Sequence, residues 1–115
     1  MNAPLDHSES PQPFVLSLPD DGNGYHEILK SPKSITMRSG LVTLQSGQEV
    51  GSHTTGKHEE LLVILDGTGE VELGGLSRQR IERGSVAYIP PATQHNVFNV
   101  DTLPLRYLYI VSRAE

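Results

Sequence analysis

Hydrophobic residues fall in short runs along this chain, and most of the runs end at glycine, proline or aspartate. The clearest run covers residues 60–65, is rich in Leu, Val and Ile, and stops at Asp66-Gly67, a pair typical of hairpin turns. Residues 69–73 then alternate between polar and apolar side chains, as the two faces of a half-buried strand do. The pattern therefore predicts short β-strands joined by tight turns.

Further strand candidates have the same form, a few β-branched, aromatic or aliphatic residues closed by turn residues. They cover residues 14–18, 25–29, 35–44, 80–82, 86–89, 95–100 and 106–111. Ser39 and Gly40 interrupt one of them, which is therefore either one bent strand or two strands around a turn. No stretch combines a helical apolar period with a cap, so we expect no helix. Short strands at this spacing are typical of an all-β sandwich or barrel.

Length and composition fit this interpretation. A chain of 115 residues is one domain's worth, and its 11 Gly and 8 Pro provide for frequent turns. Residues 1–13 are polar and contain proline, so we expect a flexible tail there, followed by a single β-barrel domain at residues 14–115.

Charge and residue content argue against several classes of protein. The net charge is −5, the nine Lys and Arg are scattered and aromatic residues make up 5%, so nucleic-acid binding is not expected. No apolar run reaches the length of a membrane span, and the first ten residues lack the basic start and apolar stretch of a signal peptide. The absence of Cys excludes a disulfide, a thiolate nucleophile and Cys-bound zinc. We therefore expect a cytoplasmic protein without membrane contact.

Three histidines and one glutamate carry the candidate chemistry. His58 and Glu60 share one face of a predicted strand, since side chains alternate along it. His53 lies just across a short loop, and His95 arrives from a separate strand pair. Taken singly, each histidine is more often a surface or hydrogen-bonded residue. Together they predict one divalent metal ion, with Fe, Mn, Ni, Zn and Cu all compatible with imidazole and carboxylate ligands.

The spacing of these residues resembles two motifs of the cupin superfamily. The first is matched by Gly47, five residues, His53, and then by Glu60, six residues, Gly67. The second is matched by Gly84, five residues, Pro90, and then by His95, three residues, Asn99. Together the two motifs and the segment between them span just under half of the chain.

Two positions depart from the motifs. Ala92 stands in a glycine place, and Thr55 stands where the family's second histidine is expected. A threonine hydroxyl is a poor ligand for these metals. Three outcomes follow: His58 replaces the missing histidine, the site works with two His and Glu60, or the metal is lost and a polar ligand pocket remains.

The resemblance implies a double-stranded β-helix, or jelly-roll barrel, whose metal ligands project inward. The ligand set it implies is His53, Glu60 and His95, with His58 as the replacement ligand. The function it implies is metal-dependent chemistry on a small molecule, of dioxygenase, isomerase or similar type, with Glu60 serving as ligand and catalytic base. The alternative is a non-catalytic cupin module that binds or senses a small ligand, and a weaker one is a partner domain of a larger assembly. A homodimer is expected by the same analogy, with residues 14–18 crossing to the neighbour.

Other polar and aromatic residues have two interpretations each. Asn99 either supports His95 through a hydrogen bond or caps a turn, and Tyr88 either lines the barrel or packs inside it. Tyr107 and Tyr109 share a face and line the pocket mouth or a subunit contact. Arg38 either binds an anionic substrate or is an ordinary exposed arginine.

Overall fold

The computed structural model describes residues 11–115, so most of the predicted tail at residues 1–13 lies outside the described residues. Nine strands form within the described part of the chain. They are β1 (Gly24–Leu29), β2 (Arg38–Leu44), β3 (His53–Thr54), β4 (His58–Asp66), β5 (Thr68–Leu73), β6 (Gln79–Glu82), β7 (Val86–Ile89), β8 (Gln94–Phe98) and β9 (Leu105–Arg113). Residues 11–115 contain no helix, and thus no helix long and apolar enough to cross a membrane. The predicted all-β class is confirmed.

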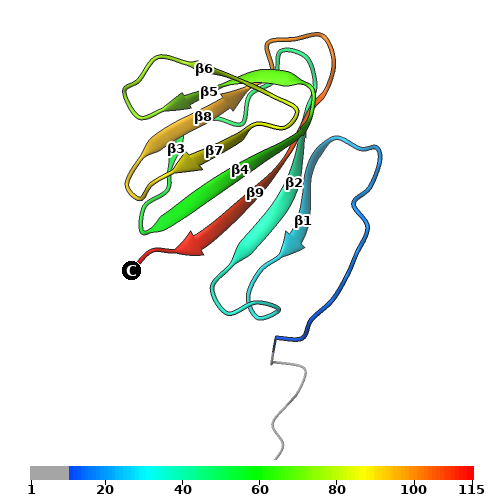
Figure 1. Cartoon of the computed structure of the whole chain (residues 1–115), viewed down its shortest axis with the longest axis vertical. Helices are drawn as coiled ribbons and strands as arrows, with labels where there is room; N and C mark the ends of the chain where they lie inside the picture. The colour runs from blue at the N-terminus through cyan, green and yellow to red at the C-terminus, as the bar shows by residue number, and fades with distance from the viewer. Residues whose placement is uncertain (1–10) are drawn as a thin grey trace, which may run out of the picture.

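The strands build two antiparallel sheets (Figure 1). One has five strands in the order β1-β2-β9-β4-β7, and the other has four in the order β3-β8-β5-β6. Several neighbours in the sheets, such as β2 and β9 or β5 and β8, come from distant parts of the sequence, and the chain passes from one sheet to the other several times. This is the arrangement of a double-stranded β-helix, as the resemblance to the cupin motifs implies.

Alternation along the strands explains how the sheets pack. In β9, Leu105, Tyr107, Tyr109 and Val111 are buried, and the residues between them are half-buried. One face of the strand therefore meets the core while the other faces outward. The buried hydrophobic cluster comprises Leu44, Leu62, Ile64, Val71, Ile81, Ala87, Ile89, Val97, Leu105, Tyr107, Tyr109 and Val111.

The prediction of a hairpin at Asp66-Gly67 is wrong. These residues do separate two strands, but β4 belongs to the five-stranded sheet and β5 to the four-stranded one, so the two are not paired. Gly67 has a positive φ of 86°, and the Pro104 carbonyl occupies the space that a β-carbon would need. A turn signal marks where the chain changes direction, and not which strand it pairs with afterwards. By contrast, Gly74 does follow β5 in a true hairpin with β6.

Two other strand predictions need correction. Residues 14–17 are exposed, Leu18 is half-buried and none of the five forms a strand, while of residues 35–44 only those of β2 are paired. Ser39 and Gly40 lie inside β2 and do not interrupt it. The reason at Gly40 is packing, because the Tyr109 ring lies where a β-carbon would stand. The two-residue strand β3 was not predicted, since it is too short to carry a periodic signal.

Candidate metal centre

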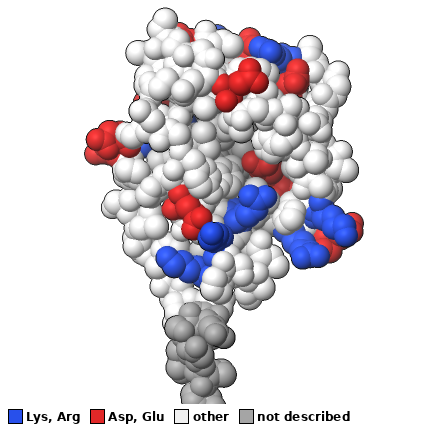
Figure 2. Space-filling model, turned by 180° about the vertical axis from the view of Figure 1, so that it is seen from behind, with Lys and Arg blue, Asp and Glu red and all other residues white. Residues whose placement is uncertain are grey.

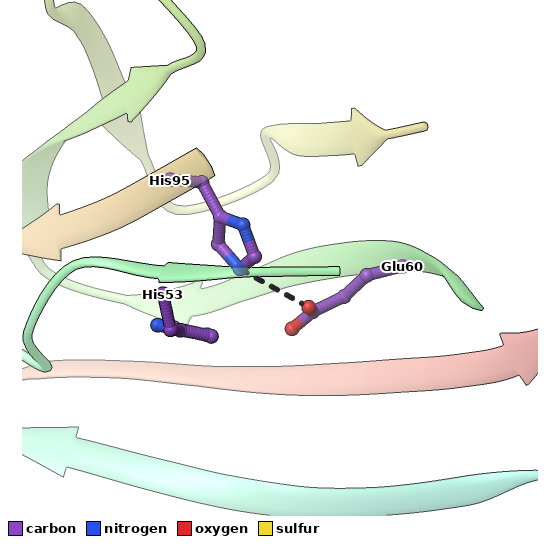
Figure 3. A group of neighbouring side chains, drawn as sticks. All are labelled: His53, Glu60 and His95. Carbon is purple, nitrogen blue, oxygen red and sulfur yellow. Dashed lines mark ion pairs between the residues drawn. The ribbon is translucent and has the colours of Figure 1, made fainter. Parts of the chain in front are cut away.

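His53, Glu60 and His95 converge between the two sheets (Figure 3). His53 on β3 and His95 on β8 are direct partners in the four-stranded sheet. Glu60 comes from β4 in the opposite sheet and points toward the histidines. One possible ligand atom from each residue lies within 4.8 Å of the others. Two imidazoles and a carboxylate at this separation form a donor set suited to a first-row divalent cation.

The three residues differ in exposure, and together they line a cavity of about 260 Å³. His95 is only 2% exposed, Glu60 is half-buried and His53 is exposed. The group is therefore closed on the His95 side and open toward the cavity. The cavity is further lined by Tyr25, Arg38, Val42, Val50, Thr54, Thr55, His58, Leu62, Val97, Tyr107, Tyr109 and Val111.

Backbone carbonyls fix the tautomer of both histidines. His53 Nδ1 lies 2.8 Å from the carbonyl of Gly51, and His95 Nδ1 lies 3.0 Å from the carbonyl of Thr93. A carbonyl oxygen only accepts, so in each ring Nδ1 carries the hydrogen and donates. The neutral imidazoles then keep their Nε2 lone pairs free. This is the tautomer that histidine needs to bind a metal through Nε2.

The environment of His95 Nε2 requires a positive charge. This buried nitrogen has no hydrogen-bond partner among the described residues, yet it lies 3.3 Å from Glu60 Oε1. In the neutral ring a lone pair would face a carboxylate oxygen, which is unfavourable unless a proton or a cation lies between them. Burial alone would lower the pKa of His95, but the Glu60 carboxylate and the bond to Thr93 together raise it. The pair therefore attracts either a proton or a metal ion.

Thr55 has a structural role at the position of the missing histidine. Its hydroxyl donates to the carbonyl of Pro90 at 2.6 Å and accepts from the backbone N–H of Thr93 at 3.0 Å. These bonds attach the loop after His53 to the turn before His95. In that turn Ala92 adopts a positive φ of 54°, the conformation that glycine would take more easily. Both departures from the motifs are thus accommodated in one turn.

His58 does not belong to the group of three. It lines the same cavity as Glu60, in agreement with their expected shared face, but its ring atoms are not within ligand distance of the group. Its role as a replacement ligand stays a prediction.

Asn96 supports the site and was missed in the sequence. Its side-chain oxygen accepts from the N–H of Gly51 at 2.9 Å, and its amide donates to Glu49 at 2.9 Å. Because the Gly51 carbonyl holds His53, Asn96 positions His53 through this loop. Nothing in the sequence pattern signals this role, since the loop is distant along the chain.

The other polar and aromatic residues now have definite places. Asn99 caps a turn, because its amide donates to the carbonyls of Leu44 and Leu103. Tyr88 neither lines nor fills the barrel: it points outward and donates to Glu59 at 2.8 Å. The inward positions of β7 are taken by its neighbours in the alternation.

The three tyrosines of the cavity form one wall. Tyr107 and Tyr109 both line it, joined by Tyr25, which the sequence did not single out. Tyr25 stacks on Tyr109 with ring centroids 5.7 Å apart. Burial raises the pKa of Tyr107, and the charge of Glu60 raises it further, so this phenol stays protonated. It is a permanent hydroxyl beside the candidate metal ligands.

Comparison with known protein families agrees with the resemblance to the cupin motifs. A family model described as a cupin domain matches residues 40–111. The uncharacterized protein MJ1618 of Methanocaldococcus jannaschii is 38% identical over 63 residues, which cover 51% of this chain and 50% of that protein. The match thus spans about half the length of this relative.

Solved structures agree on the fold. BH2720 from Bacillus halodurans superposes with a TM-score of 0.80 at 20% identity, covering 91% of this chain and 84% of that one. An RmlC-like cupin from Methanocaldococcus jannaschii gives 0.76 at 13% identity, covering 89% and 92%. A predicted oxalate decarboxylase from Thermotoga maritima gives 0.64 at 24% identity, covering 66% and 65%. At these identities the likeness concerns the fold alone.

Proposed function

The chain belongs to the cupin family, and from this premise we propose that it binds one divalent first-row metal ion through His53, Glu60 and His95 and acts with it on a small molecule. The observation that carries the proposal is the buried His95 Nε2, which faces the Glu60 carboxylate without a hydrogen bond. A cation held by both atoms removes this unfavourable contact.

The donor set fits such an ion in chemical type as well as in position. Both imidazoles present Nε2 lone pairs, and Glu60 supplies a carboxylate oxygen. Three protein ligands leave coordination positions for a substrate, as in catalytic rather than structural sites. Fe, Mn, Ni, Zn and Cu all suit these nitrogen and oxygen donors.

Catalysis is favoured over simple binding by the groups that surround the open side. A bound metal ion supplies a Lewis acid, or a centre for dioxygen chemistry, next to a cavity of about 260 Å³. Tyr107 offers a protonated phenol there, and Glu60 offers a carboxylate able to accept a proton from a ligand. These residues together suit isomerase, dioxygenase or related chemistry on a small oxygen-rich molecule.

Metal content of purified variants tests the proposal. His53→Ala, Glu60→Gln and His95→Ala are expected to lose the ion, while His58→Ala keeps it at the wild-type stoichiometry. Thermal unfolding of each variant checks that it folds. Full metal content in all three ligand variants would refute the site, and loss of metal in His58→Ala would instead favour a four-ligand centre.

A homodimer remains part of the proposal. Val15 is 98% exposed, and its neighbours Phe14 and Leu16 are also exposed, which is unusual for three successive large apolar residues. We expect this segment to pack on a second copy of the chain. Light scattering should give twice the monomer mass for the full chain and the monomer mass after removal of residues 1–18. A full-length monomer would contradict it.

A further inference from the structure

Arg38 places a positive charge at the far side of the same cavity. In the five-stranded sheet Arg38 pairs with Val111, and Val111 pairs in turn with Glu60. Residues directly opposite in neighbouring strands point to the same face, so all three face the cavity. With strands about 4.8 Å apart, the Cα atoms of Arg38 and Glu60 are about 10 Å apart along this row. Val111 stands between them in the row, so the two charged side chains flank an apolar position of the cavity.

Arg38 has no ion-pair partner among residues 11–115. Two acidic groups of the same sheet are engaged elsewhere, since Glu27 pairs with Lys30 at 3.4 Å and Glu60 lies against His95. The guanidinium is therefore available to a ligand. An arginine fork binds carboxylate oxygens in two parallel hydrogen bonds, a geometry that lysine lacks.

The Tyr25 hydroxyl lies in the same cavity as Arg38. Tyr109 donates a hydrogen bond to the hydroxyl of Tyr25, which leaves the Tyr25 hydrogen free to donate in its turn. Gly40 makes this arrangement possible, because the Tyr109 ring crosses β2 over the glycine to reach Tyr25. Burial raises the pKa of Tyr109, while the Arg38 charge acts in the opposite direction. The guanidinium charge thus reaches the Tyr109 phenol, which lines the cavity.

A basic opening adjoins this end of the cavity. A second depression of about 310 Å³ shares Arg38 and His58 with the first and is also lined by Lys30 and Arg113. None of its lining residues, all in the described part of the chain, is acidic. Figure 2 shows several Lys and Arg side chains in the lower half of the molecule, with Asp and Glu side chains among them, and in Figure 1 this half contains the turn between β1 and β2. Although the net charge of the chain is negative, the positive side chains of this depression would attract an anion toward the cavity.

We propose that the ligand is a small carboxylic acid with a second oxygen function, whose carboxylate binds Arg38 and Tyr25 and whose other oxygen faces the His53, Glu60 and His95 group. The inference rests on the proposed metal site and adds the substrate class. The second oxygen is a hydroxyl, a keto oxygen or another carboxylate. Val111, which lies between Arg38 and Glu60 in the sheet and lines the cavity, provides an apolar surface for the carbon chain between the two ends.

Calorimetric titration of the full-length zinc-loaded protein tests this. The ligands are malonate, succinate, glutarate and glycolate, with succinamide as the neutral counterpart of succinate and inorganic phosphate as a different anion. At least one of the acids should bind, and succinamide should bind more weakly than succinate by about ten-fold or more, as expected for the loss of charge-assisted hydrogen bonds.

Variants locate the carboxylate. Arg38→Gln should weaken acid binding by about ten-fold or more, and Arg38→Lys by less, at unchanged zinc content. The matched control is Arg80→Gln, because Arg80 is an exposed arginine on β6 that pairs with Glu82, away from the cavity. Equal acid affinity in Arg38→Gln and the wild type, or phosphate binding without acid binding, would overturn the inference. Failure of the wild type to hold zinc would instead overturn the metal site.

Discussion

The rings of His53 and His95 face each other across the β3–β8 ladder, with centroids 4.1 Å apart and planes inclined by 60°. Each ring is held in the same way, through Nδ1 and the carbonyl two positions before it. In this repetition backbone carbonyls, and not carboxylates, accept from Nδ1 and leave two Nε2 lone pairs directed into the site. The backbone of two loops therefore orients the histidines, and changes in those loops should affect metal binding.

Asn96→Ala is expected to weaken metal binding by about ten-fold or more, because the Gly51 loop that orients His53 loses its anchor. The measurement is the metal dissociation constant, with thermal unfolding recorded beside it. Gln94→Ala is the control, since Gln94 also flanks His95 but is exposed, and among the described residues its side chain bonds only to Ser52. Equal losses in both variants would show that Asn96 has no positioning role.

Metal-free and metal-loaded protein should respond to pH in opposite directions. The folded-state pKa of His95 is raised above 6.5, so its protonation stabilises the metal-free fold below that pH, and this contribution is lost as pH rises through the folded pKa. Metal competes with the same proton, so metal affinity should rise over that range. Unfolding with a chelator and with metal, between about pH 5.5 and about pH 8, measures both trends. His95→Gln should remove this difference in slope, and its persistence would contradict the assignment.

Thr55→Val should destabilise the protein by about 1–3 kcal/mol, since the Thr93 N–H and the Pro90 carbonyl lose their partner in a buried place. Thr55→Ser keeps the hydroxyl and should cost about 1 kcal/mol or less for the lost methyl. Chemical denaturation gives both values. Similar costs for the two variants would mean that the hydroxyl does not hold the turn.

Gly40→Ala should destabilise the protein by about 1–3 kcal/mol, because the added β-carbon would clash with the Tyr109 ring. That carbon would lie 2.7 Å from the Tyr109 hydroxyl oxygen. Near-ultraviolet circular dichroism should change as the ring moves away from Tyr25. Gly75→Ala is the matched control, having open space and no positive φ, and should be neutral or stabilising by about 0.4–1 kcal/mol. Equal stability of both variants would contradict the packing argument.

Ala92→Gly should stabilise the protein by up to about 1 kcal/mol, since the cost of a positive φ exceeds the extra chain entropy of glycine. The φ of 54° at Ala92 is the observation behind this. The same change at Ala114, where φ is not positive, should not stabilise. Loss of stability in Ala92→Gly would contradict the expectation.

The sequence predicted the fold class because alternation and turn residues are local properties. The strands at residues 86–89 and 106–111 were found for that reason, and the spacing around His53, Glu60 and His95 indicated residues that do converge. Pairing between strands is not local, which is why the Asp66-Gly67 turn was assigned to a hairpin. For the same reason Asn96 was missed, since its role depends on a loop 45 positions away.

The three candidate ligands do not come from one sheet. His53 and His95 belong to the four-stranded sheet, and Glu60 belongs to the five-stranded one. An ion held by all three would cross-link two hydrogen-bonded ladders that otherwise meet through side-chain packing. Binding of the metal ion should then slow amide hydrogen exchange in strands of both sheets, because one ion stabilises the two sheets together.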